Sequence, residues 1–403
     1  MGIAQVLQVN VRLSEGGAAG VARNISDELN RRGIRAPFAY GYGPHGDRSP
    51  DEGATNAIRL TPKGIAAANH LAYGIVGRET RLASPAALRN LDEVLSTTDV
   101  VHLHVVHSYM INTELLFEKL IRAGKPVVWT LHDQWAMTGR CAQPGSCSRW
   151  TEGCFACPDL SAYPPARIDF AASRWTQRRT AIERLQAELP TAIVPCASWL
   201  GEAASLAGLK NISVIKNSVD SVFWEATKER FESAPTSGRT PTNRNLFMCR
   251  DLRDKAKVDW ALLSRVAELR NQQLTIVGDN PPKRLATAKY SPAISSRVDL
   301  AKIFAEHDRL IFTSQVDYFP LTIAEAIASG VMVYAIRSRA SEEFEKSELV
   351  SLFDSAESMI RCLELTSSTH LGPVALTRER EFFNPTRMTE EYLELYRSLG
   401  DSV

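Results

Sequence analysis

The 403-residue sequence lacks a long apolar run, a strong excess of charge, internal repeats and low-complexity tracts. Without an apolar stretch of about 20 residues it predicts no membrane-spanning helix. A formal net charge of +1 is untypical of a dedicated nucleic-acid-binding protein, so we expect no nucleic-acid partner. The N-terminal segment MGIAQVLQVNV has no basic region typical of a signal peptide. We therefore expect a cytoplasmic protein.

Several catalytic signatures are missing as well. The Gly-rich turn near the N-terminus has neither the G-x-G-x-x-G spacing of a dinucleotide-binding site nor the Gly-Lys-Ser/Thr end of a P-loop. Neither a zinc-protease spacing nor a nucleophile elbow is present. No Asp-x-Asp pair follows a predicted strand, so we expect catalysis without a metal ion.

Strand and helix patterns alternate in two series, which is typical of parallel sheets covered by helices on both faces. The length suffices for two such domains. The sequence thus predicts an α/β fold with two doubly wound, Rossmann-like domains facing each other across a ligand cleft. We place them at residues 1–205 and 206–385, with a C-terminal helix at 386–403 that could return to the first domain. The predicted strands are Ala4–Val9, Pro37–Tyr42, Val100–His104, Val127–Leu131 and Ala192–Pro195, then Ile212–Ile215, Asn245–Cys249, Leu274–Val277, Arg309–Thr313 and Val331–Ala335.

The segment Thr313–Gly330 carries the strongest functional signal. Asp317 and Glu325 stand eight positions apart, on either side of a loop between a predicted strand and a predicted helix. Such a loop presents backbone N–H groups to an anion, and a carboxylate inside the helix can bind a neighbouring diol. Anion plus diol describes a nucleotide sugar. The alternative is that both acids are surface partners of the helix dipole. Apolar residues expected to be exposed in the loop favour the ligand site, namely Phe319, Pro320 and Leu321, followed by Thr322.

Two further loops are candidate anion sites. The turn Ser14–Gly20 follows a strand and precedes a helix, so that Gly16 and Gly17 could approach a phosphate, although a plain tight turn has the same pattern. The loop Cys249–Lys257 carries four bases that suit a diphosphate. Its acidic residues also allow a solvated charged turn. The four bases are Arg250, Arg253, Lys255 and Lys257.

Histidines end two neighbouring predicted strands of the first series. His102 and His104 close one strand, His107 follows it, and His132 closes the next. The carboxyl ends of parallel strands line the ligand crevice of such sheets, so these residues are site candidates, with His132 the best placed. A structural histidine with satisfied hydrogen bonds is the alternative for each of them.

Four of the seven cysteines are crowded together with the spacing C-x5-C-x6-C-x2-C. In a cytoplasmic chain such a cluster is more often metal-binding or redox-active than disulfide-bonded. A structural zinc site is one reading, and buried reduced thiols or a labile disulfide is the other. The cluster consists of Cys141, Cys147, Cys154 and Cys157.

Taken together, the motifs resemble glycosyltransferase family 4, whose members are retaining enzymes of the GT-B fold. The resemblance extends over most of the chain and includes Val214–Asp220, which is similar to the family's VIPNGVD, and IVGD within Thr275–Asp279. The segments NVRLSEGGAAGVA, WTLHDQWAMTGRCA, GCFACPDLSAYPPARID and VDYFPLTIAEA further resemble exopolysaccharide enzymes of the colanic-acid type, to which fucosyl transfer is ascribed.

The resemblance implies a role for each matching residue. The family's E-x7-E pair falls on Asp317, which would contact donor-sugar hydroxyls with a side chain one methylene shorter than Glu, and on Glu325, which would hold the ribose. The diphosphate would be bound by Arg253 and Lys257, or in another register by Arg250 and Lys255. His132 would hydrogen-bond the donor sugar, and His104 and His107 would lie on the acceptor side. Backbone N–H groups at Gly16, Gly17, Phe319, Pro320, Leu321 and Thr322 would surround the diphosphate (Pro320 itself contributing no donor).

These expectations define a retaining, metal-independent hexosyltransferase with no catalytic cofactor. Its donor would be a nucleoside-diphosphate sugar, weakly favouring GDP-fucose, and its acceptor a glycan or lipid-linked oligosaccharide. The mildly basic and apolar segment Ile58–Leu91 could contact the inner face of a membrane. Two alternatives remain: an epimerase or phosphorylase of the same architecture, or a degenerate, zinc-stabilised interaction protein.

Overall fold

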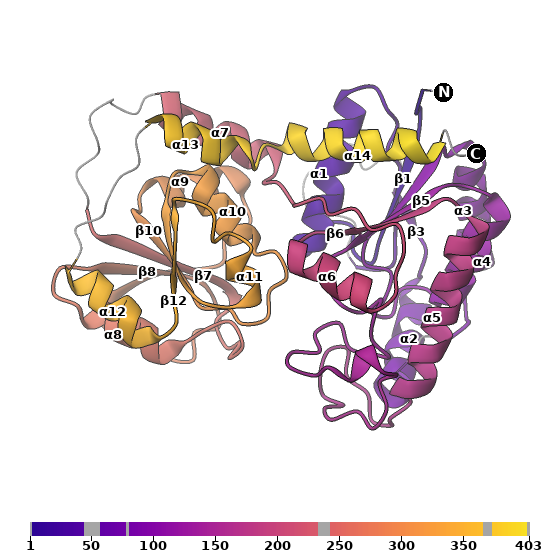
Figure 1. Cartoon of the computed structure of the whole chain (residues 1–403), viewed down its shortest axis with the longest axis horizontal. Coiled ribbons are helices and arrows are strands. Elements are labelled where there is room, and N and C mark those ends of the chain that lie inside the picture. Colours follow the sequence, from indigo (N-terminus) through magenta and orange to yellow (C-terminus); the bar gives the residue numbers. More distant parts are fainter. Residues whose placement is uncertain (1, 44–56, 78–79, 233–241, 366–372, 401–403) are drawn as a thin grey trace. The chain divides into compact units, whose positions relative to one another are not determined.

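The computed structural model describes residues 2–43, 57–77, 80–232, 242–365 and 373–400 (Figure 1). The chain divides into two compact units. The first comprises Met1–Lys216 together with Met388–Val403, and the second comprises Asn217–Arg387. The predicted boundary at residues 205 and 206 lies upstream of that division. The C-terminal helix α14 (Pro385–Gly400) contributes most of its length to the first unit.

The first unit is built around a parallel sheet in the order β3-β2-β1-β4-β5-β6. The chain winds outward from β1 to one edge and then returns to β4, so the winding direction reverses between β1 and β4. Helices α3, α4 and α5 lie side by side along one side of the sheet (Figure 1). The strands are β1 (Val6–Asn10), β2 (Phe38–Tyr40), β3 (Ala57–Arg59), β4 (Val100–Leu103), β5 (Val127–Leu131) and β6 (Thr191–Pro195), and the helices besides α14 are α1 (Gly17–Arg31), α2 (Lys63–Val76), α3 (Pro85–Thr97), α4 (Thr113–Ala123), α5 (Ala171–Glu188) and α6 (Ser198–Leu206).

The second unit repeats this plan with a parallel sheet in the order β12-β11-β10-β7-β8-β9, which reverses between β7 and β10. Both units are therefore doubly wound, as predicted. The strands are β7 (Arg244–Asp251), β8 (Gln273–Asp279), β9 (Ala288–Ser291), β10 (Arg309–Phe312), β11 (Met332–Ile336) and β12 (Val350–Phe353), and the helices are α7 (Ser221–Glu232), α8 (Trp260–Glu268), α9 (Arg297–Ala305), α10 (Leu321–Ala328), α11 (Arg339–Glu342), α12 (Ala356–Leu365) and α13 (Pro373–Glu381).

Local sequence explains why these elements form where they do. The central strands are apolar on both faces because helices cover both sides of a parallel sheet, and β1, β4, β5 and β6 are buried throughout. Helix α4 begins where the Asn112 side chain accepts a hydrogen bond from the N–H of Leu115, and it ends at Gly124 in the left-handed conformation.

Two predicted elements are wrong. Ile212–Ile215 is not the first strand of the second sheet, because Ile212 forms an isolated bridge to Ile193 at the β6 edge of the first unit. The loop predicted from Glu225 is helical as far as Glu232, since the Asp220 side chain accepts a hydrogen bond from the N–H of Phe223 and starts α7. The rest of that predicted loop includes residues 233–241, which lie outside the described residues. Strands β3, β9 and β12 were not predicted, and none of them is buried throughout its length.

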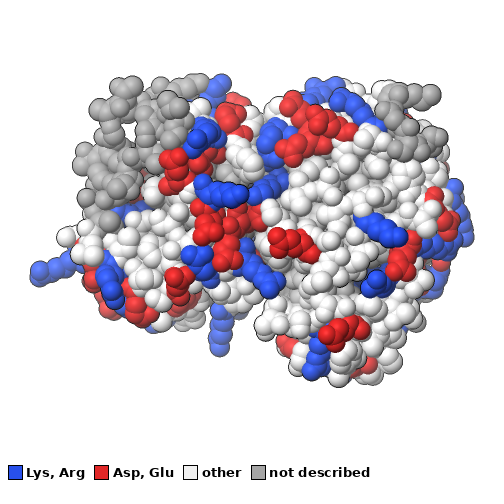
Figure 2. Space-filling model, in the orientation of Figure 1, with Lys and Arg blue, Asp and Glu red and all other residues white. Residues whose placement is uncertain are grey.

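Charge is distributed differently over the two units on the face shown in Figure 2. The second unit, on the left, carries closely mixed acidic and basic side chains, whereas the first unit shows a broad area without either. Within the described residues, no helix combines the length and apolarity needed to cross a membrane.

Candidate functional site

Most of the predicted site residues lie at the point where each sheet reverses its winding direction. The basic loop begins in the last residues of β7, and the Asp317 loop follows the adjacent strand β10, while His104 and His132 follow the neighbouring strands β4 and β5. Open parallel sheets bind ligands outside the carboxyl ends of the strands at this reversal. Each unit therefore presents its own candidate half-site.

In the second unit the structure brings together two residues that are 60 positions apart. The Lys257 Nζ donates to Asp317 Oδ1 over 2.7 Å, and both side chains are partly exposed. Burial lowers the pKa of Lys257, but the adjacent Asp317 carboxylate outweighs that effect and leaves the pKa raised above the ordinary lysine value. Lys257 is therefore a permanent cation at neutral pH, placed beside the predicted sugar-binding acid.

The backbone fixes this juxtaposition. The Thr313 hydroxyl donates to the Lys257 carbonyl oxygen over 2.5 Å, and the N–H of Gln315 donates to the Ala256 carbonyl oxygen over 3.0 Å. On the other side, a Cβ at Gly278 would lie 1.9 Å from the Cys249 carbonyl oxygen. Only glycine permits β8 to approach the end of β7 so closely. The basic loop is thus tied to both neighbouring strands.

The other three bases of this loop are less well placed. Arg253 donates to both Asp251 oxygens, at 3.0 and 2.8 Å, and its side chain is exposed. Arg250 and Lys255 are exposed too. The preferred pair of Arg253 and Lys257 is therefore not assembled at one point in this structure, because Asp251 holds the guanidinium on the surface.

Glu325 is the fifth residue of α10 and is buried. Its Oε1 accepts a hydrogen bond from Arg297 over 2.6 Å, and Arg297 also forms an ion pair with Asp220. Burial raises the pKa of Glu325, and Arg297 offsets only part of that rise. Sequence reasoning missed Arg297, which begins α9, because nothing in its local pattern distinguishes it from a surface arginine.

The apolar loop before α10 differs from expectation. Phe319 and Pro320 are buried rather than exposed, because Phe319 packs on Phe344 with ring centroids 4.9 Å apart. Their side chains are therefore core residues, and their exposure cannot be an argument for a ligand. Leu321 and Thr322 open the helix, and no side chain caps its N-terminus.

The Gly-rich turn of the first unit leads directly into α1. Gly16 has φ 92°, in the left-handed region that favours glycine, and Gly17 is the first helical residue. No side chain caps this helix either. A Cβ at Gly16 would meet no atom within 4 Å, so open space lies beside the turn.

The histidines of the first unit form a buried cluster. His132 Nε2 lies 3.0 Å from His104 Nδ1, and the two rings stack with centroids 5.3 Å apart. Burial lowers the pKa of His132 to about 4 and that of His104 well below the ordinary value. His132 is half-buried, so it is the cluster's member nearest the surface.

His107 is buried, with Nε2 2.8 Å from Asp133 Oδ2 and Nδ1 2.5 Å from the Ser108 hydroxyl. Ser108 and Tyr109 both have positive φ angles, a strained conformation for non-glycine residues that is often associated with functional sites. Because His104 is buried as well, neither of the two predicted acceptor-side histidines presents its side chain to a glycan.

The four clustered cysteines line one small cavity with Trp150. Burial raises the pKa of Cys141 to about 11, and it also raises the pKa of Cys154. Nowhere in the described part of the chain do three His, Cys, Asp or Glu side chains converge as metal ligands. The predicted zinc site stays a prediction that this geometry does not support.

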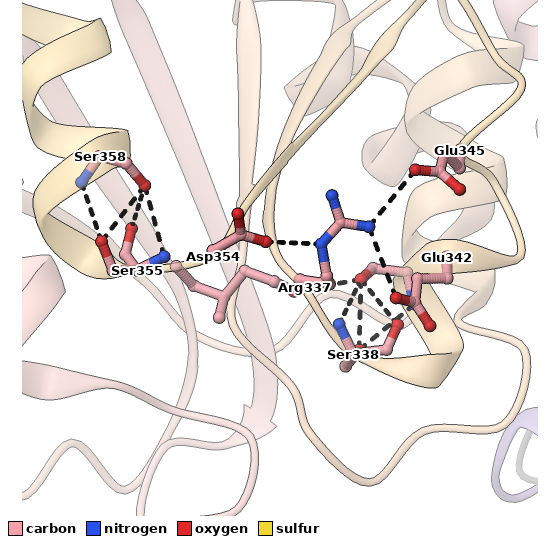
Figure 3. Close-up of polar contacts among 9 residues, drawn as sticks. Arg337, Ser338, Glu342, Glu345, Asp354, Ser355 and Ser358 are labelled. Carbon is pink, nitrogen blue, oxygen red and sulfur yellow. Dashed lines mark hydrogen bonds and ion pairs between the residues drawn. The ribbon is translucent and has the colours of Figure 1, made fainter.

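A further arginine, Arg337, is paired with three carboxylates. Arg337 follows β11, and Figure 3 shows its guanidinium between Asp354, which follows β12, and the pair Glu342 and Glu345. These groups are exposed, so the cluster adds little stability. It fixes neighbouring loops and leaves Lys257 as the better placed cation.

Comparison with solved structures shows which fold this chain has. The solved structures of a glycosyltransferase from Rickettsia africae ESF-5 (TM-score 0.60, 13% identity, 98% of each chain covered) and of sucrose-phosphate synthase from Thermosynechococcus elongatus (TM-score 0.61, 13% identity, 99% and 100% covered) share the fold. An Escherichia coli trehalose-6-phosphate protein, solved with UDP-2-fluoro glucose bound, also shares it (TM-score 0.57, 13% identity, 97% and 98% covered). The fold is that of the GT-B glycosyltransferases.

Sequence comparison identifies the family. Residues 15–223 match Glycosyltransferase Family 4, and residues 243–366 match Glycosyl transferases group 1. WcaC of Escherichia coli (strain K12), provisionally named a colanic acid biosynthesis glycosyl transferase, is 30% identical over 416 residues, covering 98% of this chain and all of WcaC. The chain belongs to glycosyltransferase family 4, as the resemblance predicted.

Proposed function

We propose that the chain is a retaining hexosyltransferase of exopolysaccharide biosynthesis. It moves a hexose or deoxyhexose from a nucleoside-diphosphate sugar to a glycan or lipid-linked acceptor, without a catalytic metal ion. The observation that supports this proposal most strongly is the Lys257–Asp317 contact, in which a cation suited to a diphosphate lies 2.7 Å from a carboxylate suited to sugar hydroxyls. The relation to WcaC supports the exopolysaccharide assignment.

Each residue of the second unit then has a defined task. Lys257 binds the diphosphate and stabilises the negative charge that it gains as the sugar leaves. Asp317 accepts hydrogen bonds from hydroxyls of the donor sugar. Glu325 binds the ribose through the oxygen that Arg297 does not occupy, and Arg297 offsets part of the effect of burial on the pKa of that carboxylate. The N-terminus of α10, at Leu321, offers N–H groups to the phosphates.

The chemistry needs no nucleophile from the protein. The bond between the anomeric carbon and the diphosphate breaks, the acceptor hydroxyl attacks from the same face, and the leaving phosphate oxygen takes the hydroxyl proton. His132 of the first unit hydrogen-bonds the donor sugar, and the uncapped start of α1 at Gly17 provides further N–H groups for the diphosphate. Positioning and charge stabilisation supply the rate enhancement.

A ligand screen tests this proposal. The full chain is heated with GDP, UDP, dTDP and their sugar conjugates, and its melting temperature is recorded. A ligand present at about 100 times its Kd stabilises the folded state by about 2.7 kcal/mol, so the true donor base gives a clear rise. GDP is our first choice. If none of these compounds raised the melting temperature, the donor site in the second unit would be refuted.

A further inference from the structure

Three polar side chains from adjacent strands form a hydrogen-bonded row in the first unit. Gln8 lies on β1, His104 follows β4 and His132 follows β5. His104 Nε2 lies 2.9 Å from Gln8 Oε1, and His104 Nδ1 lies 3.0 Å from His132 Nε2. Gln8 and His104 are almost completely buried, so Gln8 Oε1 and the two ring nitrogens of His104 depend on their protein partners.

Both imidazoles are neutral at physiological pH because burial lowers their pKa values. A neutral imidazole has one N–H donor and one bare nitrogen acceptor. The Gln8 carbonyl oxygen accepts only, so His104 must donate to it from Nε2 and must accept at Nδ1. His132 then donates from Nε2, which leaves its Nδ1 as a bare acceptor.

The neighbouring polar groups form a separate branch of hydrogen bonds. The Tyr396 hydroxyl of helix α14 lies 2.7 Å from His102 Nδ1, and His102 Nε2 lies 2.7 Å from the Thr130 hydroxyl. The Gln8 amide nitrogen has no hydrogen-bond partner among the described residues, so the contact of Oε1 with His104 is the one that carries the orientation of the amide.

We propose that Gln8 and His104 are positioning residues that hold His132 in the tautomer with its proton on Nε2. The bare Nδ1 of His132 then accepts a hydrogen bond from a sugar hydroxyl and has no proton to give to a leaving group. Only the identity of that ligand rests on the proposed function. The tautomer is a property of the protein alone.

The tautomer is measured directly on the full chain. In protein labelled with nitrogen-15 at histidine, long-range correlations between ring nitrogens and carbon-bound protons report which nitrogen is protonated. His132→Gln assigns the signal by removing it. We expect His132 in the Nε2–H form in the wild type. A wild-type His132 in the Nδ1–H form would overturn the proposal.

A variant of Gln8 tests the cause. Gln8→Leu removes the acceptor that faces His104 and should convert His132 to a mixture of both forms. Thr130→Val is the matched control, equally buried but on the His102 branch, and should leave His132 unchanged. An unchanged tautomer in a folded Gln8→Leu chain would contradict the proposal. If that variant does not fold, the tautomer of the wild type still decides.

Activity separates this inference from the proposed function. His104→Asn and Gln8→Leu should lower kcat by about 10- to 100-fold through misplacement of His132, with little change in the donor KM. Suppose that His132→Gln transfers sugar at the full rate while the wild type shows the expected tautomer. That result would refute the role of His132 in transfer but not the hydrogen-bonded row that sets its tautomer. If instead His132→Gln loses transfer while the wild type shows the Nδ1–H form, only the proposal about the row is refuted.

Discussion

The candidate sites of the two units have the same sheet topology but present different kinds of side chain. At the strand reversal of the first unit the chain places neutral, buried histidines held by hydrogen bonds. At the reversal of the second unit it places Lys257, Asp317, Arg297 and Glu325 as ion pairs. Neutral, hydrogen-bonded histidines are suited to binding hydroxyl groups. Paired charges are suited to binding a diphosphate flanked by diols. The fold supplies the place, and the residue types after each strand decide the ligand.

We expect the largest effect on activity from a substitution of Lys257 in the second unit. Lys257→Ala removes the cation that we propose stabilises the leaving diphosphate, and removal of one such group costs about 100- to 1000-fold in kcat. We expect a loss of this size, measured as nucleoside-diphosphate release in the presence of acceptor. Lys302→Ala, an exposed lysine of the same unit paired with Asp299, is the control and should leave turnover unchanged. Full turnover in Lys257→Ala would remove the diphosphate assignment.

Substitution of Glu325 tests whether a buried ion pair of the second unit contributes more to stability than an exposed one. Glu325→Gln takes away one of the two carboxylates that neutralise Arg297, so the free energy of unfolding should fall by about 1–3 kcal/mol. Ribose binding should weaken in parallel. The matched control is Glu357→Gln, which breaks an exposed pair with Arg265 and should cost less than about 1 kcal/mol. Equal effects of the two substitutions in urea unfolding would contradict this description.

Lowering the pH should reduce the stability of the folded chain through the buried histidines of the first unit. His132 has a pKa of about 4 in the folded chain and about 6.5 when unfolded, and His102 and His104 are lowered as well. The unfolded state therefore binds more protons, and stability is lost as the pH falls from about 6.5 toward 4. The slope is up to about 1.4 kcal/mol per pH unit for each histidine. Urea unfolding of the full chain at several pH values measures it, and constant stability over this range would be the contrary result.

The cysteine cluster should show the smallest effect. Because burial raises the pKa of Cys141 to about 11, its thiol should react slowly with alkylating reagents at pH 7 and faster as the pH rises. Peptide mass spectrometry measures the rate at each cysteine. A stoichiometric zinc content, with rapid alkylation only after chelation, would instead establish the site predicted from the spacing.

The sequence was sufficient for the features that depend on local pattern. Strand β5 has the predicted bounds, because a continuous apolar run is a local signal. Asp317 and Lys257 were both predicted, yet their contact depends on tertiary structure. Arg297 was missed because its partners lie on two other segments, at Asp220 and Glu325.

Exposure was harder to predict than residue identity. Phe319 was taken for a surface residue because it lies in a loop, but Phe344 covers it. His104 and His107 were placed on the acceptor side, yet their hydrogen bonds turn them inward to Gln8 and Asp133. Strand ends identify which residues lie near the ligand, and only packing determines which of them are accessible.

The central claim is that Lys257 binds the diphosphate and Glu325 the ribose. Calorimetry tests it by comparing the cognate nucleoside diphosphate with the nucleoside alone, for the wild-type chain, Lys257→Ala and Glu325→Gln. We predict that Lys257→Ala weakens binding of the diphosphate about tenfold or more and leaves nucleoside binding unchanged, while Glu325→Gln weakens both. Loss of nucleoside binding in Lys257→Ala, or unaltered diphosphate binding, would contradict the claim.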